Sequence, residues 1–350
     1  MQSADKETPR LGIIFDSGMT GIDEVLTLAL LCGFQGLQEA RLASISLSRS
    51  DLKAAAFCDS VVRFYGRAAG GQHHGILPIG LSVDVQEADE RPMIDVPLSK
   101  RNATGGLVYE QRIGKLNDTA EPSALIRNAL TAQHDQNCVV VLTGPATNLA
   151  KVLDLPGVKE LIATKVRLLA LSGGAYPEGQ VVLPINRDIP AFKKVLVEWP
   201  TPIIASGYDV GKAVSFPATS VERDFVWAPD HPIADAYRAF KSMPYDAPTW
   251  SMAPALYAVR PEQDYFRLSE PGTIQVLDSG RTRFGISPKG HHRYLILDAS
   301  QKERALQTYT QLASTKPTPK QSTLSQKLEE EKKLPQTEPP KRADVKSSAP

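Results

Sequence analysis

Short, mostly apolar runs alternate along the chain with small-residue turns and segments of helical spacing, and this alternation constrains the fold strongly. The runs, each too short for a typical helix, are residues 11–15, 41–48, 138–142, 166–171 and 202–205. Continuous apolar runs are typical of parallel strands that are buried on both faces. Repeated strand–turn–helix units build parallel sheets with helices on both sides. The sequence therefore predicts an α/β fold with a doubly wound, mostly parallel open sheet.

The first of these units carries a cluster of carboxylates. Residues 11–15, LGIIF, are the predicted strand, and residues 22–31 are apolar nearly all round, which is typical of a buried helix. Asp16 follows the strand, and Asp23 and Glu24 begin the helix, where the helix dipole stabilises acidic groups. Open parallel sheets bind their ligands beyond the carboxyl ends of the strands. The residues expected to gather at that edge are Asp16, Ser48, Thr143, Ser172 and Gly207.

Further elements follow from periodicity and capping signals. Helices are predicted at residues 51–65, 122–132, 146–153, 188–198, 233–240, 249–258 and 301–312. Short strands are predicted at residues 76–79, 273–277 and 294–297, the last two as a small antiparallel addition. Residues 82–120 show no clear period and are rich in polar residues and Gly. We expect them to form a long excursion over the sheet edge, of the kind that serves as a lid or binding loop.

Composition marks the ends of the folded part. Of the 350 residues, 42% are hydrophobic and 23% are charged, which is ordinary for a globular protein. From residue 314 onward, large apolar residues almost vanish, so burial cannot offset the entropy of ordering this segment. The predicted organisation is a disordered N-terminus at residues 1–10, one domain at residues 11–313 and a disordered tail at residues 314–350.

Charge and cysteine usage exclude several kinds of partner. The net charge of +1 gives no long-range field, so neither nucleic acid nor an anionic membrane is expected as a partner. The 3 cysteines lie in apolar contexts, which indicates buried thiols in a reducing compartment rather than disulfides or a metal site. No apolar run is long enough to span a bilayer, and residues 1–10 lack a signal-peptide core. We therefore expect a cytoplasmic protein.

A set of ordered motifs resembles one known family. Residues 16–24, DSGMTGIDE, resemble the N-terminal signature of the inosine–uridine-type nucleoside hydrolases, written DxDPGxDDA or DxDMGNDxDDA. Later resemblances are residues 142–150 to the PTGxxTNxA segment, residues 168–174 to a strand ending in an MGG or AGG turn, residues 188–191 to the DPEAA helix start, and residues 258–261 to the end of the helix with the last metal ligand. The match covers roughly residues 11–313 and implies the nucleoside hydrolase fold with its Rossmann-like core.

The resemblance also implies a chemistry. In that family the aspartates of the first motif bind a calcium ion and the ribose hydroxyls, and the ion activates the water that cleaves the N-glycosidic bond. By position, Asp23 matches the ribose ligand and Asp16 the supporting first aspartate. Glu24 would be a residual calcium ligand, and Thr143 would offer calcium its backbone carbonyl. The implied ligand is a nucleoside or ribose-like small molecule. Because members of the family often oligomerise, a homo-oligomer is compatible with the resemblance.

Several positions depart from the family pattern. Gly18 stands for the second Asp of the DxD, Glu24 for the last Asp of the DD, and Ser251 for the Asp that is the final calcium ligand. Pro184 stands for the Asn that holds the ribose, and Arg49 brings positive charge into an Asn-rich turn. Calcium prefers several carboxylate oxygens, so the loss of two predicts weak or absent calcium binding. Without the ion, nothing evident lowers the pKa of the attacking water.

Two functions are compatible with these residues, besides a purely structural role as a subunit. In the first, the chain has lost calcium-dependent hydrolysis and binds a nucleoside, a ribose-like ligand or a protein partner. In the second, it is a divergent nucleoside N-ribohydrolase that cleaves purine or pyrimidine nucleosides, with Asp16 as a substitute base or metal ligand. Asp16 and Asp23 either serve the sugar site or only cap the helix and the turn. Trp250 is either a core residue or a platform on which the base stacks.

Overall fold

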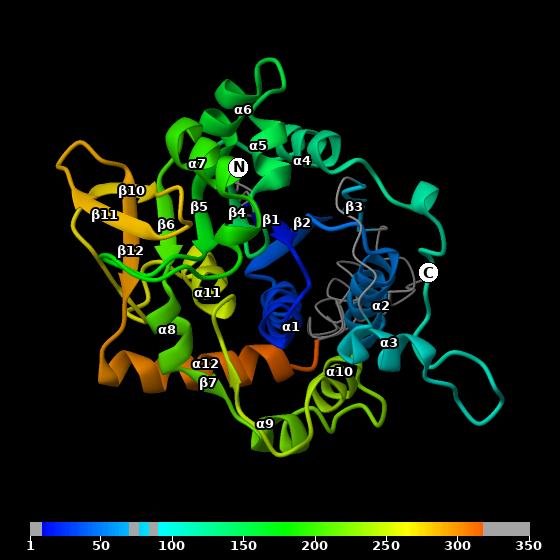
Figure 1. Cartoon of the computed structure of the whole chain (residues 1–350). Coiled ribbons are helices and arrows are strands. Elements are labelled where there is room, and N and C mark those ends of the chain that lie inside the picture. The colour runs from blue at the N-terminus through cyan, green and yellow to red at the C-terminus, as the bar shows by residue number, and fades with distance from the viewer. Residues whose placement is uncertain (1–8, 70–76, 84–89, 318–350) are drawn as a thin grey trace, which may run out of the picture. The chain divides into compact units, whose positions relative to one another are not determined.

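The computed structural model describes residues 9–69, 77–83 and 90–317. The strands of its main sheet are β1 (Leu11–Ser17), β2 (Ala40–Leu47), β3 (Ile79–Leu81), β4 (Cys138–Leu142), β5 (Val166–Ser172), β6 (Ile203–Ser206), β9 (Arg267–Leu268), β10 (Gly272–Val276), β11 (Thr282–Ile286) and β12 (His292–Ile296). They follow the order β11-β10-β12-β6-β5-β4-β1-β2-β3, and β9 pairs with β12 (Figure 1). A separate small sheet pairs β7 (Ser215–Phe216) with β8 (Ala247–Pro248).

The sheet is mostly parallel. From β3 through β2, β1, β4, β5 and β6 to β12, every neighbouring pair runs parallel. Beyond β12, β10 and β11 add an antiparallel edge. The predicted doubly wound, mostly parallel sheet is therefore confirmed. The prediction for β12 is only partly right, because this strand also extends the parallel sheet through its pairing with β6.

Helices lie between the strands and around the sheet. They are α1 (Ile22–Gly36), α2 (Leu52–Ala68), α3 (Pro92–Ser99), α4 (Pro122–Thr131), α5 (Thr147–Val152), α6 (Val158–Lys165), α7 (Ile189–Glu198), α8 (Tyr208–Ala213), α9 (Ala218–Arg223), α10 (Pro232–Phe240), α11 (Met252–Val259) and α12 (Ala299–Ser314), with 3-10 helices η1 (Leu116–Asp118) and η2 (Ile185–Arg187). Within the described ranges, no helix is both long and apolar enough to cross a membrane.

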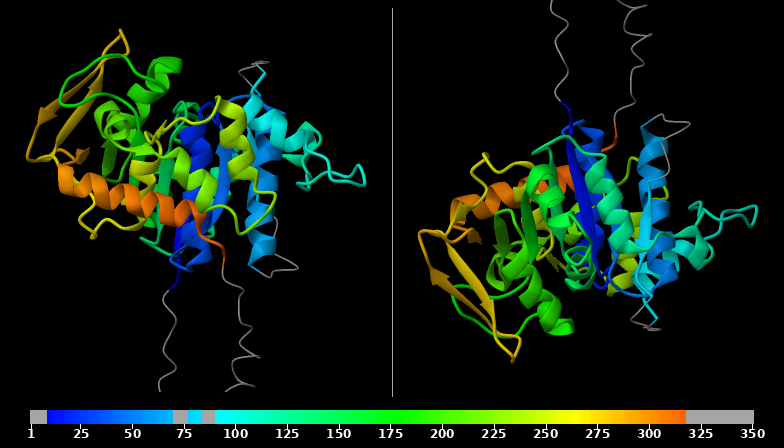
Figure 2. Two further views of the ribbon diagram at one scale, coloured as in Figure 1. Left: turned by 90° about the horizontal axis from the view of Figure 1, so that it is seen from below. Right: turned by 90° about the horizontal axis from the view of Figure 1, so that it is seen from above.

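Apolar side chains pack on both faces of the sheet. In β1, Ile13 and Phe15 belong to one core and Ile14 to the other, because successive strand residues point to opposite faces. The first core is completed by α1, α2, α11 and α12, and the second by α4, α5 and α7. Figure 2 shows α12 on the same side of the sheet as α1. At Gly33 an added Cβ would lie 2.1 Å from the Leu312 carbonyl oxygen, so only glycine permits this close helix crossing.

Most predicted elements are confirmed, and the exceptions are short. The sequence does not predict the helices α3, α6, α8 and α9 or the strands β7, β8, β9 and β11. Of these, α3 contradicts the expectation of an irregular excursion over residues 82–120. With only 8 residues and Pro97 in its interior, α3 is too short to show a helical period. Residue 76 of the strand predicted at 76–79 lies outside the described residues. So do most of the segments predicted to be disordered, residues 1–10 and 314–350, and the domain boundaries stay predictions.

Candidate functional site

A cavity of about 360 Å³ opens at the carboxyl ends of the parallel strands. Its size is suited to a small ligand. Thr143 follows β4, Ser172 ends β5 and Gly207 follows β6, and all three line the cavity, as expected for this edge. Asp23 and Glu24 line it from the first turn of α1. The strand-to-helix units therefore bring these five residues together, although they are far apart in the sequence.

The carboxylate of Glu24 is surrounded by hydrogen-bond donors. Its Oε1 accepts from the hydroxyls of Ser17 and Thr143, at 2.7 and 3.1 Å, and from the Gly18 amide at 2.9 Å. Its Oε2 accepts from the amide and hydroxyl of Thr20, at 2.5 and 3.0 Å. The residue is only 3% exposed. Both carboxylate oxygens are thus engaged by the protein itself.

The geometry of the turn explains how Glu24 reaches these donors. Its side chain folds back over the turn, where the Gly21 amide also donates to Oε2 at 3.2 Å. At Gly18 an added Cβ would lie 3.6 Å from Glu24 Oε1, so the carboxylate borders the space in which a side chain at position 18 would begin. Hydroxyl and amide hydrogens therefore converge on one buried carboxylate. A cation site requires the opposite, with oxygen lone pairs converging on a central point.

Asp23 faces the cavity beside two aromatic residues. Its Oδ2 accepts hydrogen bonds from the hydroxyl and amide of Ser251, at 2.7 and 3.2 Å. Burial, reinforced by the nearby charge of Glu24, raises the pKa of Asp23 above its ordinary range. Trp250 and Tyr208 line the same cavity and stack on each other with ring centroids 5.9 Å apart. The site thus offers a carboxylate and an aromatic wall to the same ligand.

Asp16 lies behind the cavity wall and not in it. It is fully buried, and its Oδ2 accepts a hydrogen bond from the Ser46 hydroxyl at 2.9 Å. Its backbone carbonyl accepts the Thr143 amide at 2.8 Å. Burial raises the pKa of Asp16 to about 7. The structure therefore places Asp16 under Thr143, where it supports the strand tips, and separates it from the cavity that Asp23 lines.

Comparison with solved structures shows which known fold this is. No protein-family model matches the sequence, and no curated protein matches it. A plant nucleoside hydrolase aligns with a TM-score of 0.63 at 16% identity, over 88% of this chain and 100% of that one. A purine-preferring ribonucleoside hydrolase from Gardnerella vaginalis aligns with a TM-score of 0.63 at 18% identity, over 87% and 99%. The chain has the nucleoside hydrolase fold.

A third structure with the nucleoside hydrolase fold agrees with these two. The inosine–uridine preferring nucleoside hydrolase from Bacillus anthracis aligns with a TM-score of 0.62 at 15% identity, over 87% of this chain and 99% of that one. At such low identity the shared feature is the fold. The chemistry of this cavity depends on its own side chains.

The side chains at this edge of the nucleoside hydrolase fold do not fit calcium, the ion that the sequence resemblance implies. Calcium takes about six to eight oxygen ligands, several of them carboxylates. Here Glu24 and Asp23 already accept hydrogen bonds, while Gly18 and Ser251 supply no carboxylate. In the described part of the chain, no group of 3 or more His, Cys, Asp and Glu residues could hold a metal ion.

Tyr208 is a residue of the cavity that was not predicted from the sequence. Tyr208 follows β6 and stacks on Trp250. Its position directly after Gly207, at the carboxyl end of a predicted strand, could have indicated that it belongs to the site. Leu183 and Pro184 also line the cavity and add apolar surface to it, and Leu183 is 59% exposed. Apolar and aromatic side chains in the lining of one cavity are typical of pockets that hold a planar ring.

Proposed function

We propose that the chain binds a nucleoside or a similar ribosyl compound without calcium, and that it has lost calcium-dependent hydrolysis. The ligand would lie in the cavity lined by Asp23 and Glu24, which is called the first cavity below. The observation that carries this proposal is the set of donors around Glu24. For Glu24 to become a metal ligand, several of these bonds must break. Hydrogen bonds to a charged group contribute about 1.5–3 kcal/mol each, so the loss of three costs about 5–9 kcal/mol. A micromolar affinity corresponds to about 8 kcal/mol, so this loss would cancel most calcium affinity.

Unpartnered polar atoms in the same cavity support a polar ligand. Within the described residues, the Ser206 hydroxyl and the Trp250 indole N–H are buried and have no hydrogen-bond partner. Both residues line the cavity. Buried polar groups without partners are rare in folded proteins, and a bound molecule is one way to satisfy them. A ribosyl compound offers hydroxyls for such groups and for Asp23, and its base can lie against Trp250 and Tyr208.

Calorimetry with purified protein tests the proposal. Adenosine, inosine and uridine are titrated in buffer that contains a chelator, and calcium is titrated separately into chelator-free protein. At least one nucleoside should bind in the presence of the chelator, and calcium should give no binding heat up to millimolar concentration. Tight, stoichiometric calcium binding would contradict the proposal. The Gly18→Asp/Ser251→Asp variant serves as a control, because it restores two carboxylates at the positions where the family has them.

A second candidate is a divergent nucleoside N-ribohydrolase. The observation that favours it is the position of Asp23, a carboxyl group that faces the cavity with its pKa raised above the ordinary range. Such a group is suited to proton transfer near neutral pH. Release of free base or ribose from a nucleoside, abolished by Asp23→Asn, would support this function. No release from a broad panel of nucleosides, with several divalent metals present in turn, would leave only the binding function.

A further inference from the structure

A second cavity, of about 420 Å³, adjoins the first. The two cavities share part of their walls, because Thr20, Thr143, Leu183 and Pro184 line both. A ligand seated in the first cavity can therefore continue across this boundary into the second.

Three arginines from separate parts of the chain line the second cavity. Arg49 lies in the turn after β2, Arg91 directly precedes α3, and Arg187 ends η2. Asp188 is the one carboxylate among the described residues of this wall. Its oxygens already accept hydrogen bonds from the Thr147 hydroxyl, at 2.5 Å, and from an amide at the start of α7, at 3.1 Å. Among the described charged side chains of this wall, arginines therefore outnumber carboxylates.

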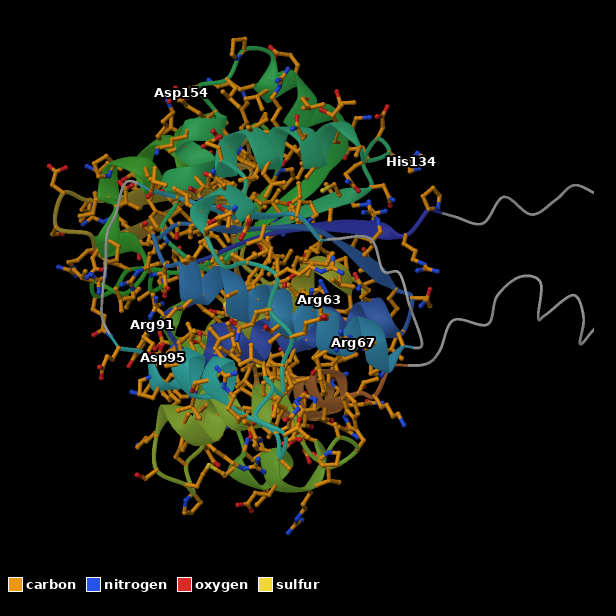
Figure 3. All side chains as sticks on the ribbon, turned by 90° about the vertical axis from the view of Figure 1, so that its right-hand side faces the viewer. Arg63, Arg67, Arg91, Asp95, His134 and Asp154 are labelled. Carbon is orange, nitrogen blue, oxygen red and sulfur yellow. The ribbon has the colours of Figure 1, made fainter. Side chains whose placement is uncertain are left out.

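Arg91 is held in place by its neighbours. Its guanidinium donates to the Met19 carbonyl oxygen at 2.9 Å and forms an ion pair with Asp51. Its backbone amide donates to the Asp95 carboxylate at 2.9 Å, and Figure 3 shows the two residues side by side. The side chain of Arg91 is 13% exposed. Its guanidinium is thus preorganised at the edge of the cavity before any ligand arrives.

The arginines are close enough to affect one another. Burial, and next the positive charge of Arg49, lower the pKa of Arg91, although Glu24 and Asp95 offset part of this effect. Arg49 itself is only 9% exposed. Like charges in a poorly hydrated wall repel each other, and a bound anion would relieve that repulsion. Guanidinium groups match phosphate oxygens in charge and in planar, two-point geometry.

We propose that the second cavity binds the phosphate group of a phosphorylated ribosyl ligand, of which a nucleoside monophosphate is the simplest example. This inference rests on the proposed binding of the ribosyl group in the first cavity. The charges set the orientation of the ligand, because Asp23 and Glu24 disfavour a phosphate in the first cavity and the arginines attract it to the second. The ligand would cross the boundary at Thr20 and Thr143.

Calorimetry at physiological salt, with chelator present, tests this orientation. The probes are adenosine, inosine and uridine, their 5′-monophosphates, and inorganic phosphate alone. The monophosphate of the nucleoside that binds should bind at least tenfold more tightly than that nucleoside. Arg187→Ala should lower the affinity for the monophosphate about tenfold and leave that for the nucleoside unchanged. Arg187→Lys should recover part of the loss. Arg127→Ala, an exposed arginine on α4, is the matched control and should change neither affinity.

The outcomes separate the two proposals. If a nucleoside binds and its monophosphate binds no more tightly, the second cavity is not a phosphate site and the proposed function stands. If neither binds, the proposed function fails and the inference fails with it. If inorganic phosphate alone binds as tightly as the monophosphate, the two cavities do not share one ligand. Equal losses for nucleoside and monophosphate in Arg187→Ala would also overturn the inference, because they would indicate a general disturbance of the site.

Discussion

The two adjoining cavities meet at Thr20 and Thr143 and present opposite charges. The first contains Glu24, both of whose carboxylate oxygens accept hydrogen bonds from the protein, and Asp23, whose Oδ2 accepts hydrogen bonds from Ser251. Among the described residues, the second contains three arginines and one carboxylate, Asp188, whose oxygens already accept hydrogen bonds. The described charged side chains are thus carboxylates on one side of the boundary and mostly arginines on the other.

This difference teaches that the number of acidic residues is a poor guide to a metal site. The turn at residues 16–24 retains three carboxylates, yet the one extra methylene of Glu24 lets its carboxylate fold back onto the turn. What matters is which groups point at the carboxylate, because donors and a cation compete for the same lone pairs. The fold provides the place where ligands bind, and the local charges decide which ligands are accepted.

Replacing the buried carboxylate of Glu24, in the wall of the first cavity, should have the largest effect on stability. In Glu24→Gln the amide NH₂ would face hydroxyl and amide donors that now point at an oxygen. We expect the free energy of unfolding to fall by about 3–5 kcal/mol, because the charge is lost and several buried donors are left without an acceptor. Urea denaturation measures this loss. The matched control is Glu222→Gln, an exposed carboxylate on α9, which should change stability by less than about 0.5 kcal/mol. Equal effects of the two substitutions would show that the donors around Glu24 contribute little.

The pH dependence of stability tests the raised pKa of Asp16, the buried carboxyl group behind the first cavity. The pKa of Asp16 is raised from 3.8 to about 7, so between these values the folded state binds more protons than the unfolded state. Stability should therefore fall as pH rises from about 4 to about 7, by up to about 4 kcal/mol, and the change should be complete above that range. Asp16→Asn lacks this titration. The free energies of unfolding of the wild type and of Asp16→Asn, measured at several pH values, should therefore become more similar towards acid pH. If the two proteins showed the same pH dependence of the free energy of unfolding, the raised pKa of Asp16 would be contradicted.

The aromatic wall of the first cavity should have a smaller effect, confined to binding. Trp250→Ala removes the larger of the two stacked rings, and base stacking on an aromatic side chain contributes about 1–3 kcal/mol. We expect nucleoside affinity to fall by about five- to a hundredfold in calorimetry. Trp250→Phe keeps a ring and should retain most of the affinity. If both variants bind as the wild type does, Trp250 is a packing residue and the base lies elsewhere.

The sequence predicted the architecture because buried parallel strands and their turns leave local signals. The runs that became β1 and β4 are apolar throughout, and Thr143 and Gly207 were correctly expected at the edge where the strands end. The sequence also indicated that Gly18 and Ser251 remove two carboxylates. It could not show where the side chain of Glu24 points, because that depends on the backbone path of the turn.

The second cavity could not be predicted from the sequence, for a related reason. Arg49 was expected to bring positive charge to the edge, but its partners in the wall come from distant segments. Arg91 lies in the stretch that shows no period, and Arg187 lies in a short 3-10 helix without a recognisable signal. A cluster assembled from three separate segments leaves no local pattern. Only the tertiary arrangement brings these side chains together.

The smallest expected effect is a difference in salt dependence between the two cavities. Exposed and partly exposed charges are screened by salt, whereas stacking and apolar contacts are not. When ionic strength is raised from about 0.05 M to about 0.5 M, nucleoside monophosphate affinity should fall several-fold and nucleoside affinity should change by less than twofold. Arg187→Ala should reduce the salt dependence of monophosphate binding, because it removes an exposed cation from the second cavity. If nucleoside and monophosphate respond equally to salt, the charge difference between the cavities does not govern ligand choice. The fold would then present one continuous pocket in which the arginines serve only to hold the wall together.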